Sequence, residues 1–565
     1  MNRYWPKGMP TSLDYPDLTT GELLTAAAKL YGNRPAVVDG EDHFTFAQLH
    51  EHATAFAQGV RNAGVRDGDV VLLHLPNSAW FLVGYYGALL AGATVALANP
   101  LQPAPALRSQ LLDTGAVVAL SHPAHVSALL HARTGSSVRT VVVVPPSACA
   151  PYPYPQHTAP DDAVVALADF VAAGPEVPPK TTVTADDVAH IVYTGGTTGV
   201  SKGVRTLHRN VVANVAQMTA WRAAHVMTEE VGGDIRLRPI QGVHDTGVHP
   251  GAAVTVMVSP LFHVHALITM SFLLLCGTTI VLTGRFSPER MLADIERHRA
   301  SYLLGGPTLW HALLECPDLK VRDLSCVRVI SSGGAPADET TLLALSTAFP
   351  TAVVVEGYGL TEGTCVVASA PLPRDALRKL GSVGLPLFDT TVEIRPITGG
   401  PAVCRPHEVG ELWVRGPQVT AGYLNQPEAT AAQFVEGWLR TGDLGHLDEE
   451  GFVFLSGRAK EMLIHKGYNM YPSELEDILH GHRSVRAAAV IGSSDPRAGQ
   501  IPIAFVVARP GAVIDPDEVM AYVAERVLPY KKIRAVHVVD TLPVSAAGKV
   551  LKSALRVPSR TEQAG

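Results

Sequence analysis

Short apolar strands alternate with apolar helices in the first part of the chain, and this alternation limits the folds that the chain can adopt. The run GDVVLLHLP (68–76) predicts a buried strand, FLVGYYGALLAG (81–92) a helix that ends at Gly92, and ATVALANP (93–100) the next strand. Strands joined through helices form parallel sheets that are covered on both faces. The sequence therefore predicts an α/β fold.

The length and a change of pattern near residue 455 predict two unequal parts. At 565 residues the chain exceeds one ordinary domain of about 100 to 200 residues, so we expect several compact units fused into a large body. The strand GFVFLSG is followed by RAKEMLIHKGYNMYPSELEDIL and then by a shorter unit with the strands AAAVIGS, IPIAFVVA and AVHVVD and one helix, PDEVMAYVAERVL. We predict a large N-terminal domain of layered sheets flanked by helices (1–456), a linker (457–460) and a small mobile C-terminal α+β domain (461–565).

Three segments need separate interpretations. Residues 145–180 are rich in Pro, Ala and Tyr, which predicts a surface excursion without catalytic residues. Residues 222–251 are polar and punctuated by glycine, so we interpret them as a long loop; its histidines, His225, His244 and His249, lack metal-ligand spacing. The apolar run 266–284 carries five Thr or Ser residues and two glycines, which favours a buried helix followed by a strand over a membrane span.

Composition excludes several function classes. Charged residues make up 17% of the chain, the net charge is −7 and the pI is near 6.4, so we expect no nucleic-acid or anionic-membrane partner and favour a small molecule. The six cysteines form no C-x-x-C pair, which fits reduced thiols in a cytoplasm and no bound transition metal. The N-terminal stretch has no apolar h-region, so a secretory signal is not expected.

The segment YTGGTTGVSKGV (193–204) predicts a cradle for phosphate oxygens. Glycines let backbone N–H groups approach a ligand, hydroxyls donate hydrogen bonds and a lysine adds a mobile positive charge. The pattern is not the G-x-x-x-x-G-K-[ST] loop, because Ser201 and Gly203 stand at two of its fixed positions. An ordinary turn is the alternative for such a cluster. The candidate nucleotide-binding residues here are Thr194, Gly195, Gly196, Thr197, Thr198, Gly199 and Lys202.

Seven motifs in series resemble one enzyme family. They are YTGGTTGVSKGV, PLFHVHAL (260–267), SSGGAP (331–336), EGYGLTEG (356–363), GWLRTGDLG (437–445), GRAKEMLIHKGYNMYPSELE (457–476) and LPVSAAGKVLK (542–552). Their order and spacing resemble the acyl- and aryl-CoA synthetases of the adenylate-forming superfamily, which also includes luciferases and peptide-synthetase adenylation domains. The resemblance covers nearly the whole chain from about Glu22.

The resemblance implies a two-step reaction that uses ATP, Mg²⁺ and CoA. A carboxylate attacks the α-phosphorus of ATP and releases pyrophosphate, and the thiol of CoA then displaces AMP from the acyl-adenylate. Two anions repel as they approach each other, so such a site must supply fixed donors and a cation. The loop at 193–204 would then hold the leaving pyrophosphate.

The resemblance also assigns roles to individual residues. Glu362 is similar to the family's magnesium-associated glutamate, and Thr361 would bond the α-phosphate. Asp443 would accept both ribose hydroxyls, and Arg458 would contact the nucleotide. Lys549 matches the lysine that is delivered to the carboxylate and the α-phosphate.

Lys460 matches the hinge position about which the small domain rotates. Read singly, each of these residues also has a structural interpretation: a helix start for Thr361 and Glu362, a turn for Asp443, and solvated surface charge for Lys460 and Lys549.

The remaining motifs predict the adenine site and the acyl pocket. His263 resembles a gating aromatic residue between the acyl carboxylate and the thiol channel, although a lone histidine after a strand is more often a satisfied core residue. Gly334, Ala335, Glu356, Gly357 and Tyr358 complete the predicted nucleotide set. The predicted acyl pocket comprises His263, His265, Gly333, Gly334, Gly357 and Gly359, where missing side chains leave volume for a bulky acyl group.

The substrate and the acceptor stay open between alternatives. Phe262 is followed by His263 where amino-acid-adenylating relatives usually carry an aspartate, so a plain carboxylic acid is favoured, and among these a fatty or other hydrophobic acid. The thiol acceptor is CoA or, alternatively, the phosphopantetheine of an acyl carrier protein. A catalytically silent nucleotide-binding scaffold is the alternative from another class. Both a monomer and a homodimer are compatible with the sequence.

The phosphate loop departs from the family pattern T-S-G-T-T-G-x-P-K-G at two positions. Gly195 replaces a serine and Ser201 replaces a proline, so one hydroxyl donor is absent and the loop is less stiff. We expect weaker ATP binding with retained activity, and tighter binding in the variant Gly195→Ser. Isothermal titration with ATP checks this, and equal affinities in the two proteins would contradict it.

Overall fold

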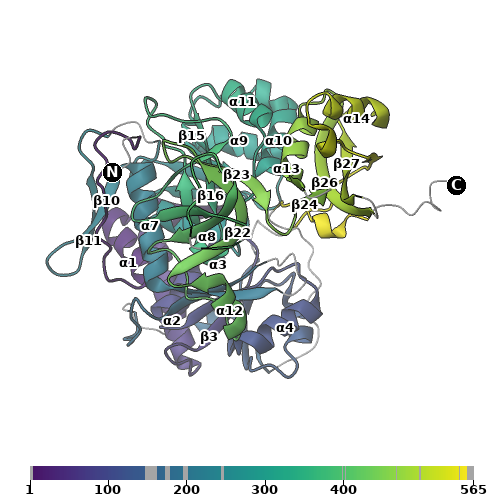
Figure 1. Ribbon diagram of the computed structural model, residues 1–565. Coiled ribbons are helices and arrows are strands. Elements are labelled where there is room, and N and C mark those ends of the chain that lie inside the picture. The colour runs from purple at the N-terminus through teal and green to yellow at the C-terminus, as the bar shows by residue number, and fades with distance from the viewer. Residues whose placement is uncertain are drawn as a thin grey trace.

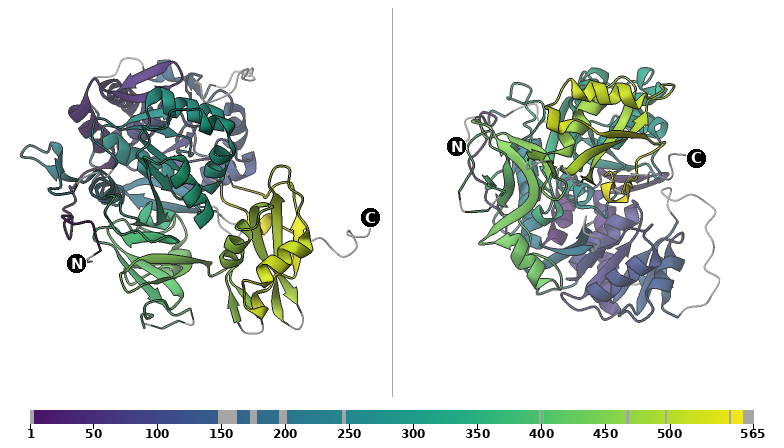
Figure 2. Two further views of the ribbon diagram at one scale, coloured as in Figure 1. Left: turned by 90° about the horizontal axis from the view of Figure 1, so that it is seen from above. Right: turned by 45° about the vertical axis from the view of Figure 1, so that its right-hand side comes forward.

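The computed structural model describes residues 4–146, 162–171, 178–194, 201–243, 247–397, 399–400, 402–465, 468–495, 498–545 and 548–556. Two sheets and the helices around them form the large domain (Figure 1). A third, smaller sheet belongs to the C-terminal part, which Figure 2 shows as a separate lobe beside the large domain.

The first sheet has seven strands within the described residues, and all neighbours are parallel except the last pair. In spatial order they are β7 (Val164–Ala166), β6 (Thr140–Val143), β5 (Val118–Ser121), β3 (Val70–His74), β4 (Thr94–Leu97), β8 (Val188–Thr194) and β9 (Lys202–Leu207). The expected strand, helix and strand over residues 68–100 are confirmed as β3, α3 (Ala79–Leu90) and β4.

The second sheet has fourteen strands in the described part of the chain. Along its path lie β19 (Thr391–Arg395), β20 (Gly410–Arg415), β22 (Trp438–Leu447), β23 (Val453–Arg458), β18 (Ser382–Pro386), β17 (Val366–Ser369), β16 (Val353–Gly359), β15 (Val329–Ser332), β14 (Tyr302–Gly305), β12 (Val254–Met257), β13 (Thr279–Leu282), β1 (Pro35–Asp39) and β2 (Asp42–Thr45), with β21 (Phe434–Val435) paired to β22. The stretch from β16 to β1 is parallel and the stretch from β19 to β17 is antiparallel.

Period-two alternation of apolar side chains produces the layers. Val71 and Leu73 of β3 face one core, whereas Leu72 between them faces another. The shared core between the two sheets contains α1 (Thr20–Tyr31), α2 (Phe46–Asn62), α3, α7 (His208–Ala223) and α8 (Val264–Leu275). The outer faces are covered by α4 (Ala104–Thr114) and α5 (Val126–Ala132) on the first sheet, and by α9 (Pro288–His298), α10 (Pro307–Glu315) and α11 (Glu339–Ala348) on the second. The predicted fold class is confirmed.

The small domain has a sheet of five strands among the described residues and two helices. The strands are β25 (Tyr468–Met470), β24 (Leu463–His465), β27 (Gly499–Ala508), β26 (Val485–Asp495) and β28 (Ala535–Val538). The helices α13 (Pro472–His480) and α14 (Pro516–Ala524) share one core with β26 and β27. The predicted helix is α14. The other helix, α13, lies in the segment before the predicted unit, where Pro472 begins a helix whose Leu475 and Leu479 are buried one turn apart.

Two segments expected to be irregular contain regular structure. Within 145–180, β7 joins the edge of the first sheet and α6 (Leu167–Phe170) places Phe170 against Phe56, with ring centroids 5.5 Å apart. Within 222–251, β10 (His225–Glu229) and β11 (Ile235–Pro239) form an antiparallel hairpin whose turn uses the positive φ angles of Gly232 and Gly233. Loop predictions failed there because a short strand needs a partner that composition does not reveal.

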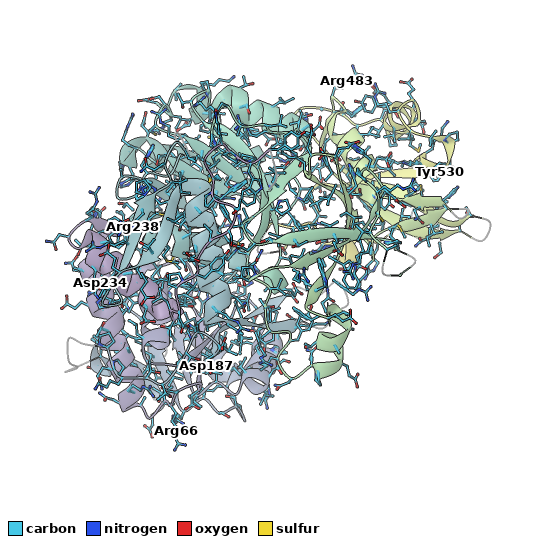
Figure 3. The ribbon with its side chains drawn as sticks, turned by 60° about the vertical axis from the view of Figure 1, so that its left-hand side comes forward. Arg66, Asp187, Asp234, Arg238, Arg483 and Tyr530 are labelled. Atoms are coloured by element: carbon cyan, nitrogen blue, oxygen red, sulfur yellow. The ribbon has the colours of Figure 1, made fainter. Side chains whose placement is uncertain are left out.

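The hairpin projects from one edge of the large domain, where Figure 3 labels Asp234 and Arg238. Asp234 accepts from Lys29 Nζ of α1 at 2.6 Å, which ties the hairpin to the body. His225 lies in β10, and His244 lies outside the described residues.

The apolar run 266–284 is confirmed as α8, from its third residue on, followed by β13, both in the interior. The helices in the described ranges are all too short or too polar to cross a lipid bilayer. The remaining short elements are α12 (Pro427–Gln433) and the 3₁₀ turns η1 (Pro317–Lys320), η2 (Thr361–Gly363), η3 (Pro529–Lys531) and η4 (Lys552–Ala554).

Candidate active site

Lys202 and Glu362, distant in sequence, meet at one tyrosine. Glu362 lies in η2, directly after β16, and its Oε1 accepts a hydrogen bond of 2.7 Å from the hydroxyl of Tyr423. Lys202 begins β9, and its Nζ lies 4.6 Å from the centroid of the Tyr423 ring. Burial and the neighbouring carboxylate keep the pKa of Tyr423 well above its ordinary value, so the phenol stays protonated and donates.

Asp443 is the centre of a second set of contacts. It is 6% exposed, and the antiparallel register of β22 and β23 places it opposite Arg458. Arg458 Nε lies 3.1 Å from Oδ1, and the Tyr358 hydroxyl donates to Oδ2 at 2.7 Å. Each carboxylate oxygen has two acceptor positions, so Asp443 retains capacity for ligand hydroxyls.

Lys549 comes to this site from the small domain. The carbonyl of Gly548 accepts from Thr308 Oγ1 of α10 at 3.2 Å, so the loop that carries Lys549 is docked on the large domain. Lys549 is exposed to solvent, yet partial desolvation by the surrounding protein lowers its pKa. Arg458 lowers that pKa further, whereas Asp443, Glu461 and Glu362 oppose the change. The lysine therefore shares an electrostatic neighbourhood with Glu362 and Asp443.

Two histidines line the start of α8. His263 is the N-cap residue of this helix, and burial together with the nearby Lys549 lowers its pKa to about 4. Burial, Arg222 and His263 lower the pKa of His265 to about 4 as well. Both imidazoles are therefore neutral near pH 7, when they can accept hydrogen bonds.

The glycines predicted to leave pocket volume face different surroundings. A Cβ atom on Gly333 would stand 3.0 Å from His265 Nε2, and one on Gly359 would overlap the carbonyl oxygen of Cys365 at 1.6 Å. At these two positions the space is thus taken by protein, which gives each glycine a packing reason. Gly334 has a φ of +81°, where a side chain would be strained. Their place in an acyl pocket stays a prediction.

The rest of the predicted nucleotide set is only partly described. Glu356 lies in β16 opposite Ser332 of β15, and its Oε1 accepts from the N–H of Ala337, two residues after Ala335, at 3.1 Å. Thr194 ends β8, and its carbonyl accepts from Ser201 Oγ at 2.5 Å. Gly195, Gly196, Thr197, Thr198 and Gly199 lie outside the described residues.

The sequence motifs did not identify three residues of this region. Tyr423 organises Lys202 and Glu362, Thr308 docks the small domain, and Arg222 extends from α7 toward Gly357. None of them belongs to a glycine-rich or charged motif, so only their neighbours in space identify them. The hinge role of Lys460 and the linker at 457–460 stay predictions; β23 ends at Arg458 and β24 begins at Leu463.

Comparison with known proteins places this site in a family context. Residues 24–424 match the profile described as "AMP-binding enzyme", and residues 474–549 match "AMP-binding enzyme C-terminal domain". The chain is 31% identical to a long-chain-fatty-acid–CoA ligase of Bacillus subtilis, with 98% of this chain and 96% of the relative covered. It is 32% identical to 4-coumarate-CoA ligase 2 of Narcissus pseudonarcissus, with 91% and 86% covered.

The crystal structure of ATP-bound MatB from Rhodopseudomonas palustris has the same fold, with a TM-score of 0.82 and 26% identity. The superposition covers 95% of this chain and 98% of that protein. The likeness therefore extends over both domains.

Glu356 makes the stability of the chain depend on pH. Burial, with repulsion from Asp477, Asp338 and Glu339, raises its pKa to about 7 from the ordinary 4.5. A raised carboxyl pKa means that the folded protein loses stability as pH rises from about 5 to about 7, because the unfolded chain ionises first. The loss levels off above that range at about 3 kcal/mol.

The variant Glu356→Gln removes this loss, so we expect it to exceed the wild type in thermal stability increasingly from pH 5 to pH 8. Thermal unfolding at a series of pH values measures the difference. The exposed residue Glu428 provides the control, since Glu428→Gln should shift the melting temperature equally at every pH. A constant difference for Glu356→Gln would disprove the assignment.

Proposed function

The chain belongs to the AMP-binding enzyme family and is an AMP-forming acid–thiol ligase, and on this premise we propose how its residues divide the work. The acid is a fatty or other hydrophobic carboxylic acid. Its carboxylate oxygen attacks the α-phosphorus of ATP, the bond to the bridging oxygen breaks and pyrophosphate leaves. The sulfur of CoA then attacks the acyl carbonyl carbon, the thiol proton is lost and AMP leaves with the bonding electrons.

The convergence of Lys549 with Glu362 and Asp443 is the observation that carries this proposal. Lys549 holds the carboxylate and the α-phosphate together while their negative charges approach, which is the costliest part of the step. Arg458 and Asp443 hold the ribose, and Thr361 donates to the α-phosphate. Lys202 and the loop before it hold the β- and γ-phosphates.

Mg²⁺ suits the oxygen chemistry of Glu362. A hard cation prefers carboxylate and phosphate oxygens, and Mg²⁺ is commonly held by one or two carboxylates plus substrate phosphates. In the described ranges no group of three or more His, Cys, Asp or Glu residues is placed so that it could hold a metal ion. When bound, the ion would neutralise charge on the leaving pyrophosphate.

Neutral His263 and a rotating small domain would serve the second step. With a pKa of about 4, the His263 imidazole is neutral near pH 7 and forms no ion pair with the thiolate of the acceptor. Rotation about Lys460 would withdraw Lys549 and open a path for the thiol. CoA is the proposed acceptor, and a carrier-protein phosphopantetheine is the alternative within the same chemistry.

Exchange of labelled pyrophosphate into ATP, dependent on added acid, tests the first step. A panel of acids assayed for AMP release, with CoA, with a carrier protein or with neither, then identifies substrate and acceptor. If no acid supported pyrophosphate exchange, the alternative of a catalytically silent nucleotide-binding protein would be favoured.

The variant Lys549→Ala separates the two half-reactions. We expect adenylation to fall about 100- to 1,000-fold, because a cation directed at the developing charge is lost. Thioester formation from a supplied acyl-adenylate should remain close to the wild-type rate. The control Arg534→Ala removes an exposed charge from the same domain and should change neither rate. Equal loss of both half-reactions in Lys549→Ala would refute the division of labour.

Tyr423 permits a graded test of the Glu362 site. Tyr423→Phe keeps the ring beneath Lys202 but removes the donor to Glu362, so the Mg²⁺ concentration for half-maximal rate should rise about 10-fold or more. Tyr423→Leu removes the ring as well and should also raise the KM for ATP. Magnesium and ATP titrations measure both effects. An unchanged magnesium requirement in Tyr423→Phe would contradict the role of this hydrogen bond.

A further inference from the structure

Arg222, at the last turn of α7, is a buried cation surrounded by neutral partners. The residue is 4% exposed. Its Nη1 donates to the hydroxyls of Tyr302 and Ser331, and its Nη2 donates to Ser369 Oγ at 3.2 Å. These hydroxyls come from β14, β15 and β17, so the guanidinium spans the middle of the large sheet.

Within the part of the chain that the structure describes, Arg222 has no acidic side chain as an ion-pair partner. The hydroxyl contacts use three of its five N–H groups. Burying an arginine without an opposing charge is costly, and hydroxyl dipoles offset only part of that cost. A group that brings an acceptor to this arginine would therefore be stabilised strongly.

The Nη2 end of the buried guanidinium faces Gly357, in one of the motifs of the candidate active site. A Cβ atom on Gly357 would lie 3.5 Å from Arg222 Nη2, so only a missing side chain separates this arginine from the EGYG segment. Arg222 also acts on His265, whose pKa it lowers, and His265 in turn borders Gly333. The arginine thus lies next to Gly357 and acts electrostatically on His265, two of the residues predicted to line the acyl pocket.

The position of Arg222 is fixed from the opposite side. The adjacent Trp221 is buried, its Nε1 donates to the carbonyl of Ala370 at 3.3 Å, and its ring packs on Trp5 and Phe388. A helix end held in this way cannot easily turn its arginine toward solvent. The charge is therefore presented permanently to the interior.

We propose that Arg222 is a specificity residue that binds an oxygen acceptor on the acyl part of the substrate, remote from the carboxylate that is activated. This inference rests on the proposed function and narrows its substrate class. The acid is mainly apolar but carries a carboxylate, ketone or hydroxyl group that reaches the guanidinium. A plain alkyl chain would leave the charge without a counterpart and would bind less well.

Matched pairs of acids test the proposal. AMP formation is measured with straight-chain monocarboxylates and with the α,ω-dicarboxylates and ω-hydroxy acids of equal length, over a series of chain lengths. We expect the wild type to favour an acceptor-bearing acid at one length. Arg222→Met should lower kcat/KM for that acid about 10- to 100-fold, which corresponds to the loss of a hydrogen bond to a charged group. The kcat/KM for the straight-chain monocarboxylate of equal length should stay the same or rise.

Two controls separate this role from a structural one. Arg209→Met changes an exposed arginine of the same helix and should alter neither preference. Arg222→Lys keeps the charge and should retain a preference for the dicarboxylate. This variant also tests the proposal if Arg222→Met does not fold. A wild type without preference, or an equal loss for both acids in the Arg222 variants, would overturn the proposal.

Calorimetric titration of the wild type with the same acids distinguishes failure of this inference from failure of the proposed function. Tighter binding of the acceptor-bearing acid would support the role of Arg222 even if no acid formed AMP. Equal binding of both acids would overturn it even in an active enzyme.

Discussion

Two tyrosine–carboxylate hydrogen bonds fix the charged groups on which the rest of the site depends. Tyr423 holds Glu362 and Tyr358 holds Asp443, each at 2.7 Å. A buried phenol needs an acceptor, and a partly desolvated carboxylate needs a donor, so each pair satisfies both requirements at once. The carboxylates are thereby oriented before any ligand binds, and the cations Lys202, Arg458 and Lys549 are arranged around them. Such preorganisation is how a protein favours developing charge without reorganising at the moment of reaction.

Charges also act between the large and the small domain. Lys549 is attracted by Asp443 and Glu362 but repelled by Arg458, and Asp477 of the small domain adds repulsion to buried Glu356. Attraction and repulsion across one interface partly cancel. The Thr308 hydroxyl contacts the docked loop, and Arg486 of the small domain lies 3.8 Å from Glu315 of α10. Such a mixed interface is compatible with the proposed rotation of the small domain.

Much of the fold can be predicted from the local pattern of apolar residues, whereas the contacts that position the site residues cannot. The apolar runs around β3, α3 and β4 define their elements, because burial on both faces leaves few alternatives. The hairpin β10–β11 could not be predicted in this way, since its strands are half exposed and depend on each other. Glu362 and Asp443 stand in recognisable motifs, but Tyr423 and Thr308 act through neighbours 61 and 240 residues away in sequence. No local pattern encodes such distances.

The glycines show why a sequence motif describes a backbone better than a pocket. Gly359 is needed because the Cys365 carbonyl occupies the place of a side chain, and Gly333 because the His265 ring lies there. A missing side chain therefore does not equal empty volume; it lets another part of the protein approach. What approaches then decides the chemistry of the wall. Behind Gly357 that part is the guanidinium of Arg222, and so the character of this region is set by a helix more than a hundred residues earlier in the chain, not by the glycine motif itself.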